Sequence, residues 1–154
     1  MDASQVLKQY FGYDSFRKGQ SDIIEAILQG KDALAIMPTG AGKSVCYQVP
    51  AMLLSGITIV ISPLISLMQD QVKSLNEAGI NAAYINSTLS EQQMYKALDY
   101  AAQGKYKIIY VAPERLETMS FMTFAQKADI SMVTIDEAHC ISQWGQDLIT
   151  DYLK

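Results

Sequence analysis

Short apolar runs alternate along this chain with longer segments in which apolar residues recur at intervals of three and four positions. Runs rich in Val and Ile are typical of buried strands, whereas the wider spacing is typical of amphipathic helices that bury one face. The predicted strands are Ala33–Met37, Thr58–Ile61, Ala82–Asn86, Lys107–Ala112 and Met132–Ile135. The predicted helices are Asp22–Gln29, Lys43–Leu54, Leu64–Ala78, Glu91–Gln103 and Glu114–Ala128, the last with internal breaks.

Capping residues support several of these helix ends. Ser90 precedes the helix predicted at 91–103 as an N-cap, and Gly30, Gly79 and Gly104 each follow a predicted helix as a stop signal. Strands that alternate with helices at these lengths predict an α/β fold with a mostly parallel, doubly wound sheet and right-handed crossovers. With 154 residues, of which 49% are hydrophobic, the chain has the size of a single domain, 1–154, with one sizeable core.

The composition also bears on location and on redox chemistry. No stretch approaches the roughly 20 consecutive apolar residues that span a bilayer, and the N-terminal sequence MDASQVLKQY lacks the basic and apolar regions of a signal peptide. We therefore expect a cytoplasmic protein without membrane contact. The two cysteines, Cys46 and Cys140, lie far apart and lack metal-ligand spacing, so we expect small buried apolar residues in a reducing compartment.

The formal net charge of −4 argues against a chain that holds nucleic acid by bulk electrostatic attraction. Any nucleic-acid contact is therefore expected to be local. The basic residues are scattered, and only Arg17 with Lys18 and Lys105 with Lys107 stand close together in the sequence. The second pair is interpreted as a solvated surface.

Residues Met37–Ser44 read MPTGAGKS, a relaxed form of the phosphate-binding loop motif, with Met37 where the strict motif has glycine. Glycines allow the loop to wrap phosphates with its backbone N–H groups, and the helix that follows adds a favourable dipole. Lys43 would reach the β- and γ-phosphates of ATP, and the Ser44 hydroxyl would bind Mg²⁺. The residues predicted to bind the nucleotide here are Thr39, Gly40, Ala41, Gly42, Lys43 and Ser44.

A second acidic motif completes the predicted site. Met132–Ile135 is expected to deliver Asp136 to the carboxyl end of a buried strand, where ligands of open α/β sheets bind. Asp136 would hold Mg²⁺ through water, and Glu137 would orient and deprotonate the attacking water, so hydrolysis is possible as well as binding. Each motif alone is also compatible with an ordinary glycine turn or a solvated helix start, but their order and strand context favour an ATP site.

Three of the predicted strands end in a polar or proline-containing segment: MPTG, ISPL and VAPER. A proline at a strand end is often only a stop signal, because it cannot continue a central strand. The carboxyl ends of parallel strands nevertheless meet at one edge of the sheet, together with the phosphate loop and Asp136. Backbone N–H groups and hydroxyls at this edge could bind the phosphates of a polymer.

Several segments resemble RecQ-family DNA helicases: FGYDSFRKGQ, MPTGAGKSVCYQVPA, ISPLISLMQDQV, YVAPERL and DEAHCISQWG. The loop motif and DEAH would fit many superfamily 2 helicases, whereas the first and last of these segments are typical of RecQ in particular. The resemblance implies a RecA-like P-loop NTPase domain that uses ATP and Mg²⁺. It also implies 3'–5' unwinding of duplex DNA in repair and recombination, in bacteria at the nucleoid.

The resemblance further implies roles for individual residues. Tyr13, Arg17 and Gln20 would recognise adenine, which fits their capacity for stacking and for paired hydrogen bonds. The alternative for Gln20 is a surface helix residue. His139 and Gln143 would couple the ATP site to a second motor domain. The residues implied to contact single-stranded DNA are Ser62, Pro63, Leu64, Pro113, Arg115 and Trp144.

Two departures from the family are visible. Where the family reads WGHDFRPxY, this chain reads WGQDLITDY, so Gln146, Leu148, Ile149 and Thr150 replace His, Phe, Arg and Pro. The chain also ends at Lys154, before a second RecA-like domain. We therefore expect the first motor domain of a RecQ-like helicase. Two alternatives remain: a nucleotide-binding half motor with negligible hydrolysis, and another P-loop ATPase or kinase.

Overall fold

The computed structural model describes residues 1–31 and 42–136, which fall into two compact units, Met1–Ser55 and Gly56–Lys154. The strand predicted at Ala33–Met37 lies outside the described residues. Among the helices that the structure describes, none combines the length and apolar character needed to cross a membrane. Each unit has its own hydrophobic cluster and is described by itself.

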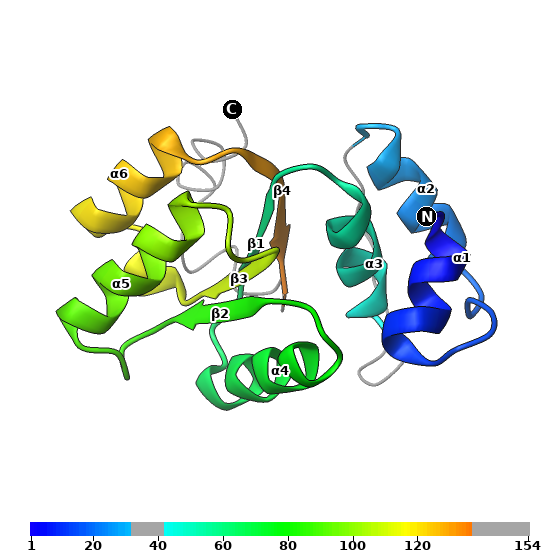
Figure 1. The fold of residues 1–154 in the computed structure, drawn as a ribbon, viewed down its shortest axis with the longest axis horizontal. Helices are drawn as coiled ribbons and strands as arrows, with labels where there is room; N and C mark the ends of the chain where they lie inside the picture. The colour runs from blue at the N-terminus through cyan, green and yellow to red at the C-terminus, as the bar shows by residue number, and fades with distance from the viewer. Residues whose placement is uncertain (32–41, 137–154) are drawn as a thin grey trace. The chain divides into compact units, whose positions relative to one another are not determined.

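The first unit is helical in its described part. It contains α1 (Ala3–Val6), the π-helical turn η1 (Leu7–Phe11), α2 (Gln20–Leu28) and α3 (Val45–Leu53) (Figure 1). Buried apolar side chains from all four elements pack into one cluster. The members of this cluster are Val6, Leu7, Ile24, Val45 and Val49.

The N-terminal helix was not predicted from the sequence. Its start is nevertheless specified locally, because the Asp2 side chain accepts from the Gln5 backbone N–H at 2.9 Å and the Gln5 side chain accepts from the Asp2 backbone N–H at 2.8 Å. This reciprocal capping box satisfies two N–H groups that the first helical turn leaves without partners. The predictions for α2 and α3 were correct to within two residues at each end.

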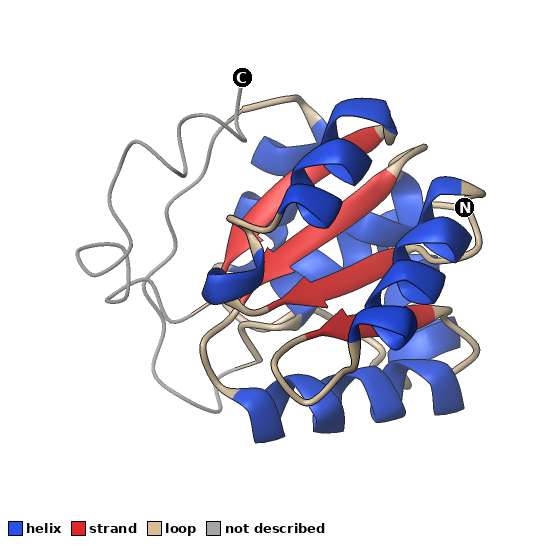
Figure 2. Ribbon diagram, turned by 90° about the vertical axis from the view of Figure 1, so that its left-hand side faces the viewer, coloured by secondary structure: helices blue, strands red, loops and turns tan. Residues whose placement is uncertain are grey.

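The second unit contains a parallel sheet with the spatial order β2–β3–β1–β4 (Figure 2). Its strands are β1 (Ile57–Ile61), β2 (Ala82–Ile85), β3 (Ile108–Val111) and β4 (Ile130–Ile135). The central strand β1 pairs with β3 from Thr58 to Ile61 and with β4 along its other side. All neighbours run in parallel, so the predicted α/β class and sheet type are confirmed.

Helices connect these parallel strands, as crossover connections require. They are α4 (Ile65–Glu77), α5 (Glu91–Ala102) and α6 (Met119–Lys127), with a short 3-10 turn, η2 (Pro113–Arg115), before α6. Ser90 caps α5 as predicted, within a capping box that includes Gln93. The helix predicted at 114–128 with internal breaks is interrupted in the structure, because Thr118 adopts an extended conformation and starts α6 as a new N-cap.

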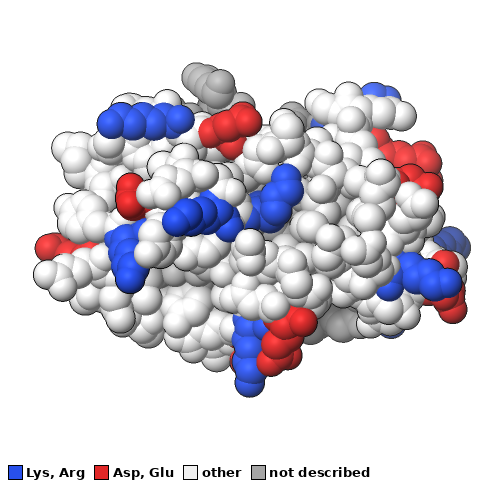
Figure 3. Space-filling model, in the orientation of Figure 1, with Lys and Arg blue, Asp and Glu red and all other residues white. Residues whose placement is uncertain are grey.

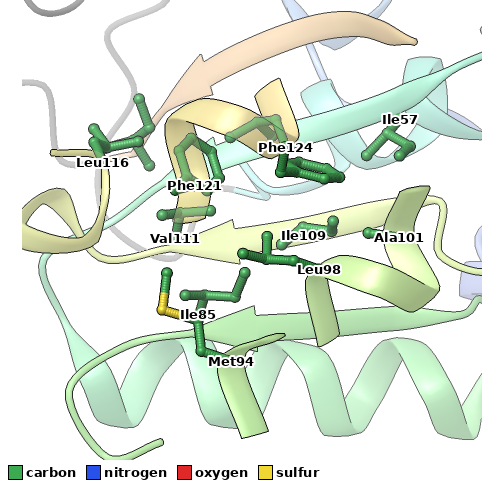
Figure 4. Packing of buried hydrophobic residues seen from close by; sticks show 12 residues of the cluster. Ile57, Ile85, Met94, Leu98, Ala101, Ile109, Val111, Leu116, Phe121 and Phe124 are labelled. Carbon is green, nitrogen blue, oxygen red and sulfur yellow. The ribbon is translucent and has the colours of Figure 1, made fainter. Parts of the chain in front are cut away.

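The main core of the second unit lies between one face of the sheet and helices α5 and α6 (Figure 4). Phe121 and Phe124 of α6 pack with their ring centroids 5.7 Å apart, above Ile109 and Val111 of β3. Side chains alternate between the faces of a strand, so Asn86, just after β2, points to the opposite face, where its amide contacts Met68 of α4. The sheet is therefore covered by helices on both faces.

Gly56 marks a close approach between β1 and β4. A Cβ atom at this position would lie 2.3 Å from the Asp129 carbonyl oxygen and 2.5 Å from the Ser131 hydroxyl oxygen. Without that atom, the Gly56 N–H donates to Ser131 Oγ at 2.7 Å, beside an irregularity in the strand pairing. Only glycine fits here, because the obstructing atom is backbone.

Candidate functional site: phosphate loop and sheet rim

The described end of the phosphate loop leads directly into α3. Gly42 has a φ of 79°, a left-handed conformation that favours glycine, and its carbonyl accepts from the Val45 N–H at 3.2 Å. Lys43 and Ser44 follow, both half-buried, immediately before the first turn of α3. The first N–H groups of a helix point out of its end and favour an anion there. Of the predicted phosphate-binding loop, the described residues are thus a left-handed glycine, a lysine and a serine at the start of a helix.

Gln20 is tied to this loop, although 22 positions separate it from Gly42. Its Nε2 donates to the Gly42 carbonyl at 2.9 Å, and its Oε1 accepts from the Arg17 backbone N–H at 2.7 Å. Gln20 is 3% exposed, so the alternative of a surface helix residue is wrong. A Cβ at position 42 would lie 2.7 Å from Gln20 Nε2, so the two residues are matched in shape as well as in hydrogen bonding.

We expect Gln20→Ala to loosen this turn in the nucleotide-free chain. The change removes two hydrogen bonds at a buried position, which corresponds to about 1–3 kcal/mol. Hydrogen exchange of the Arg17 amide should become about tenfold faster or more, because its acceptor is lost. Gln29→Ala, at an exposed position after α2, is the matched control and should leave that exchange rate unchanged. Unaltered exchange at Arg17 in Gln20→Ala would contradict this account.

The two other residues implied to recognise adenine lie in the same segment. The Tyr13 side chain is 51% exposed and Arg17 is also exposed, so both are accessible to a ligand from solvent. The guanidinium Nη1 of Arg17 lies 3.6 Å from the position that a Cβ on Gly42 would occupy. The structure thus brings Arg17, Gln20 and the end of the phosphate loop together, while Tyr13 remains at the surface.

In the second unit, the carboxyl ends of the strands form a row, which we call the rim. In spatial order it comprises Asn86 after β2, Ala112 after β3, Ser62 after β1 and Asp136 after β4. Asp136 is 7% exposed, and its backbone N–H donates to the Ile61 carbonyl at 2.9 Å. The predicted delivery of Asp136 to the end of a strand is confirmed, whereas the expected burial of that strand is wrong, because β4 is mostly half-buried.

The predicted polymer-contact residues lie on this rim with different exposures. Ser62 is buried and its hydroxyl accepts from the Leu64 N–H at 3.4 Å, whereas Leu64 is 46% exposed. Pro113 is buried at the start of η2. Pro63 is half-buried between Ser62 and Leu64.

The guanidinium of Arg115 is turned toward the connection between β2 and α5. Nη2 donates to the Leu89 carbonyl at 3.3 Å, and Nη1 lies 3.6 Å from the Met94 sulfur. Arg115 therefore joins two rim segments, and its cation is held near the rim by these contacts.

The segment after β2 was not among the residues predicted from the sequence. Asn86 is fully buried, and its side-chain oxygen accepts from the backbone N–H of Thr88 at 2.9 Å and from the Thr88 hydroxyl. Ser87 and Thr88 are exposed beside it. The sequence feature that could have indicated this segment is an Asn–Ser–Thr run directly after a strand. Such a composition is typical of turns that are fixed by side-chain hydrogen bonds.

Several predicted residues lie outside the described part of the chain: Thr39, Gly40, Ala41, Glu137, His139, Gln143 and Trp144. Within residues 1–31 and 42–136, no three His, Cys, Asp or Glu side chains gather in a way that could hold a metal ion. Cys46 is buried, and this burial raises the pKa of its thiol, in keeping with an apolar role.

The chain was compared with known proteins. The family model described as DEAD/DEAH box helicase matches residues 17–154. An ATP-dependent DNA helicase RecQ of Bacillus subtilis is 54% identical over 97% of this chain and 26% of its own length. The corresponding protein of Haemophilus influenzae is 49% identical over 99% of this chain and 25% of its own length. The chain thus spans about a quarter of the length of these relatives.

A solved structure supports the fold. The crystal structure of a hypothetical ATP-dependent RNA helicase from Sulfolobus tokodaii superposes with a TM-score of 0.72 at 25% sequence identity. The superposed region covers 98% of this chain and 45% of the solved chain. The predicted RecA-like α/β architecture is therefore found in a helicase structure.

Proposed function

Because the chain belongs to the DEAD/DEAH box helicase family and is similar throughout to RecQ members, we propose that it is the ATP-binding motor domain of a RecQ-type DNA helicase. In the intact protein it would couple ATP hydrolysis to 3'–5' unwinding of duplex DNA during repair and recombination. The observation that carries this proposal is the turn at Gly42, which is held by Gln20 and followed by Lys43 and Ser44 before α3.

These residues fit a nucleoside triphosphate. The left-handed Gly42 and the first N–H groups of α3 suit phosphate oxygens, and Lys43 supplies a compact positive charge for the terminal phosphates. Gln20 suits the adenine edge, since its amide both donates and accepts. In the nucleotide-free chain that amide bonds to Gly42 and Arg17, so adenine would have to compete for it. Recognition of the base would then alter the phosphate loop directly.

The metal site and the hydrolytic residues would complete this arrangement. Ser44 and Asp136 would hold Mg²⁺, which neutralises charge that develops on the phosphates. Glu137, which follows Asp136 in the sequence, would accept a proton from the attacking water. His139 and Gln143 would transmit the state of the nucleotide to a second motor domain.

DNA would bind along the rim of the second unit. Ser62, Pro63 and Leu64 follow β1, Pro113 and Arg115 follow β3, and the structure has these strands as neighbours. Backbone N–H groups at the rim and the cation of Arg115 suit phosphates of a single strand. Trp144 would add a stacking surface for a base.

A second candidate is a nucleotide-binding module with negligible turnover. It is favoured by the sequence WGQDLITDY, in which Leu148 and Ile149 stand where the family has an aromatic and a cationic residue. Stacking on an aromatic contributes about 1–3 kcal/mol per base, so its loss would weaken the link between DNA and hydrolysis.

Calorimetric titration of Mg·ATP, with phosphate release measured with and without single-stranded DNA, separates these candidates. We expect saturable binding and slow hydrolysis that single-stranded DNA accelerates. Binding without turnover in either condition would favour the nucleotide-binding module. Absence of Mg·ATP binding by the folded chain would contradict both.

A further inference from the structure

A local concentration of lysine and tyrosine lies outside the ATP site and the rim. Between residues 92 and 107, three positive charges against one negative charge leave a formal charge of +2, in a chain whose net charge is −4. Three tyrosines are interleaved with these lysines, a composition that suits single-stranded nucleic acid. The residues are Tyr95, Lys96, Asp99, Tyr100, Lys105, Tyr106 and Lys107.

Two of the lysines converge on one aromatic ring. The ammonium Nζ of Lys105 lies 4.4 Å from the centroid of the Tyr100 ring, and that of Lys96 lies 5.7 Å from it. Asp99, the acidic residue nearest in sequence, instead accepts a hydrogen bond from Gln103 Nε2 at 3.0 Å. Neither Lys96 nor Lys105 forms an ion pair with a carboxylate in the part of the chain that the structure describes.

This convergence brings two like charges to one surface site. The ring attracts each ammonium by about 0.5–1 kcal/mol at an exposed position, while the two charges repel each other. An anion that contacts both would relieve the repulsion without desolvating a buried group. A phosphate suits the site, because its several oxygens can accept from two ammonium groups at once.

The cluster lies at the amino edge of the sheet, opposite the rim. Lys105 belongs to the turn between α5 and β3, and Lys107 directly precedes β3, with its Nζ 3.4 Å from the Gly56 carbonyl before β1. Figure 3 shows Lys and Arg side chains spread over the face on which Figure 1 draws α5, with separate acidic side chains among them. Burial and the neighbouring Tyr100 raise the pKa of Tyr106, so this phenol stays neutral at physiological pH.

We propose that Lys96, Tyr100 and Lys105 form a second contact for the phosphate backbone of single-stranded DNA, separate from the rim. The proposal rests on the proposed DNA-helicase function for the class of ligand, and on the paired lysines for its place. Tyr95, which is 59% exposed on the turn of α5 before Tyr100, offers a ring for a base next to the bound phosphate. An acidic protein segment would use the lysines but would not need the exposed ring of Tyr95.

The test uses fluorescence anisotropy of a labelled oligothymidylate titrated with the full 154-residue chain over a series of salt concentrations. The test variant is Lys96→Gln/Lys105→Gln. The matched control, Lys31→Gln/Lys73→Gln, removes the same charge at two exposed lysines elsewhere. Each phosphate contact with a single strand contributes about 0.7 to the slope of log K against log salt concentration. The test variant should therefore lose about 1.4 of this slope and bind roughly tenfold more weakly at low salt.

Tyr100 provides an independent check, since Tyr100→Phe keeps the ring and Tyr100→Leu removes it. We expect Tyr100→Phe to bind like wild type and Tyr100→Leu to lose affinity. If wild type binds clearly and the test and control variants have equal salt slopes, the second contact is overturned and the helicase proposal remains intact. The same titrations with labelled polyglutamate test an acidic protein partner. If the test variant loses polyglutamate binding but keeps its oligothymidylate binding, the second DNA contact is overturned in favour of such a partner. Absence of oligothymidylate binding by wild type would count against the DNA contacts of both proposals.

Discussion

Lys43→Ala is expected to weaken Mg·ATP binding by about a hundredfold or more. Lys43 stands between the left-handed Gly42 and the first turn of α3, and no other residue of the relaxed loop motif carries a positive charge. Hydrogen bonds to charged groups contribute about 1.5–3 kcal/mol each, and about 2.8 kcal/mol corresponds to a hundredfold change in Kd. Calorimetric titration of Mg·ATP into the purified variant measures the effect.

The matched control for this change is Lys31→Ala, an exposed lysine of the same unit. It removes the same charge and should change the Kd less than twofold, because an exposed charge beyond the site is largely screened by salt. Similar losses in both variants would indicate that overall charge, and not the loop, governs binding. Wild-type affinity in Lys43→Ala would refute the assignment of the phosphate site.

Phe121→Ala is expected to destabilise the second unit by about 3–5 kcal/mol and to lower Tm by about 10 °C or more. Phe121 is fully buried between α6 and the sheet, where its ring packs against Phe124. Truncation leaves a cavity that the surrounding strands and helices can close only in part. Thermal unfolding followed by circular dichroism checks this expectation.

Met119→Ala is the control for this change, because Met119 lies on the same helix and is 79% exposed. We expect its Tm to remain within about 2 °C of wild type, as for most surface substitutions. A Phe121→Ala variant as stable as Met119→Ala would show that the face of α6 has been misassigned. Because β1 and β3 border this core and end at the rim, oligothymidylate binding should also weaken near the Tm of the variant.

The sequence predicted most of the described secondary structure where local signals agreed. The β-branched run Ile57–Ile61 and the serine cap at Ser90 define β1 and α5 without tertiary information. The internal breaks expected within 114–128 were not assigned to a residue, because apolar spacing continues through the position where Thr118 caps α6. The N-terminal helix was missed although its capping box is visible in the sequence.

The residue types of the candidate site could be predicted from the sequence, whereas the contacts between its residues could be predicted less well. The motif around Lys43 carries its own chemistry, because the loop needs glycine, a cation and a hydroxyl in fixed order. The bond from Gln20 to the Gly42 carbonyl joins positions 22 residues apart and depends on how α2 packs beside α3. The contact of Arg115 with the Leu89 carbonyl likewise depends on strand order, which apolar periodicity does not encode.

The strand order β2–β3–β1–β4 differs from the order in which the chain reaches the strands. Adjacent rim segments are therefore supplied by separate crossovers, each of which returns to the opposite edge before the next strand begins. An insertion in an amino-edge turn such as 103–107 lengthens one connection and shifts no rim segment. The positions of the rim segments therefore depend on all four strands together, whereas each amino-edge turn belongs to a single connection and can change in length by itself.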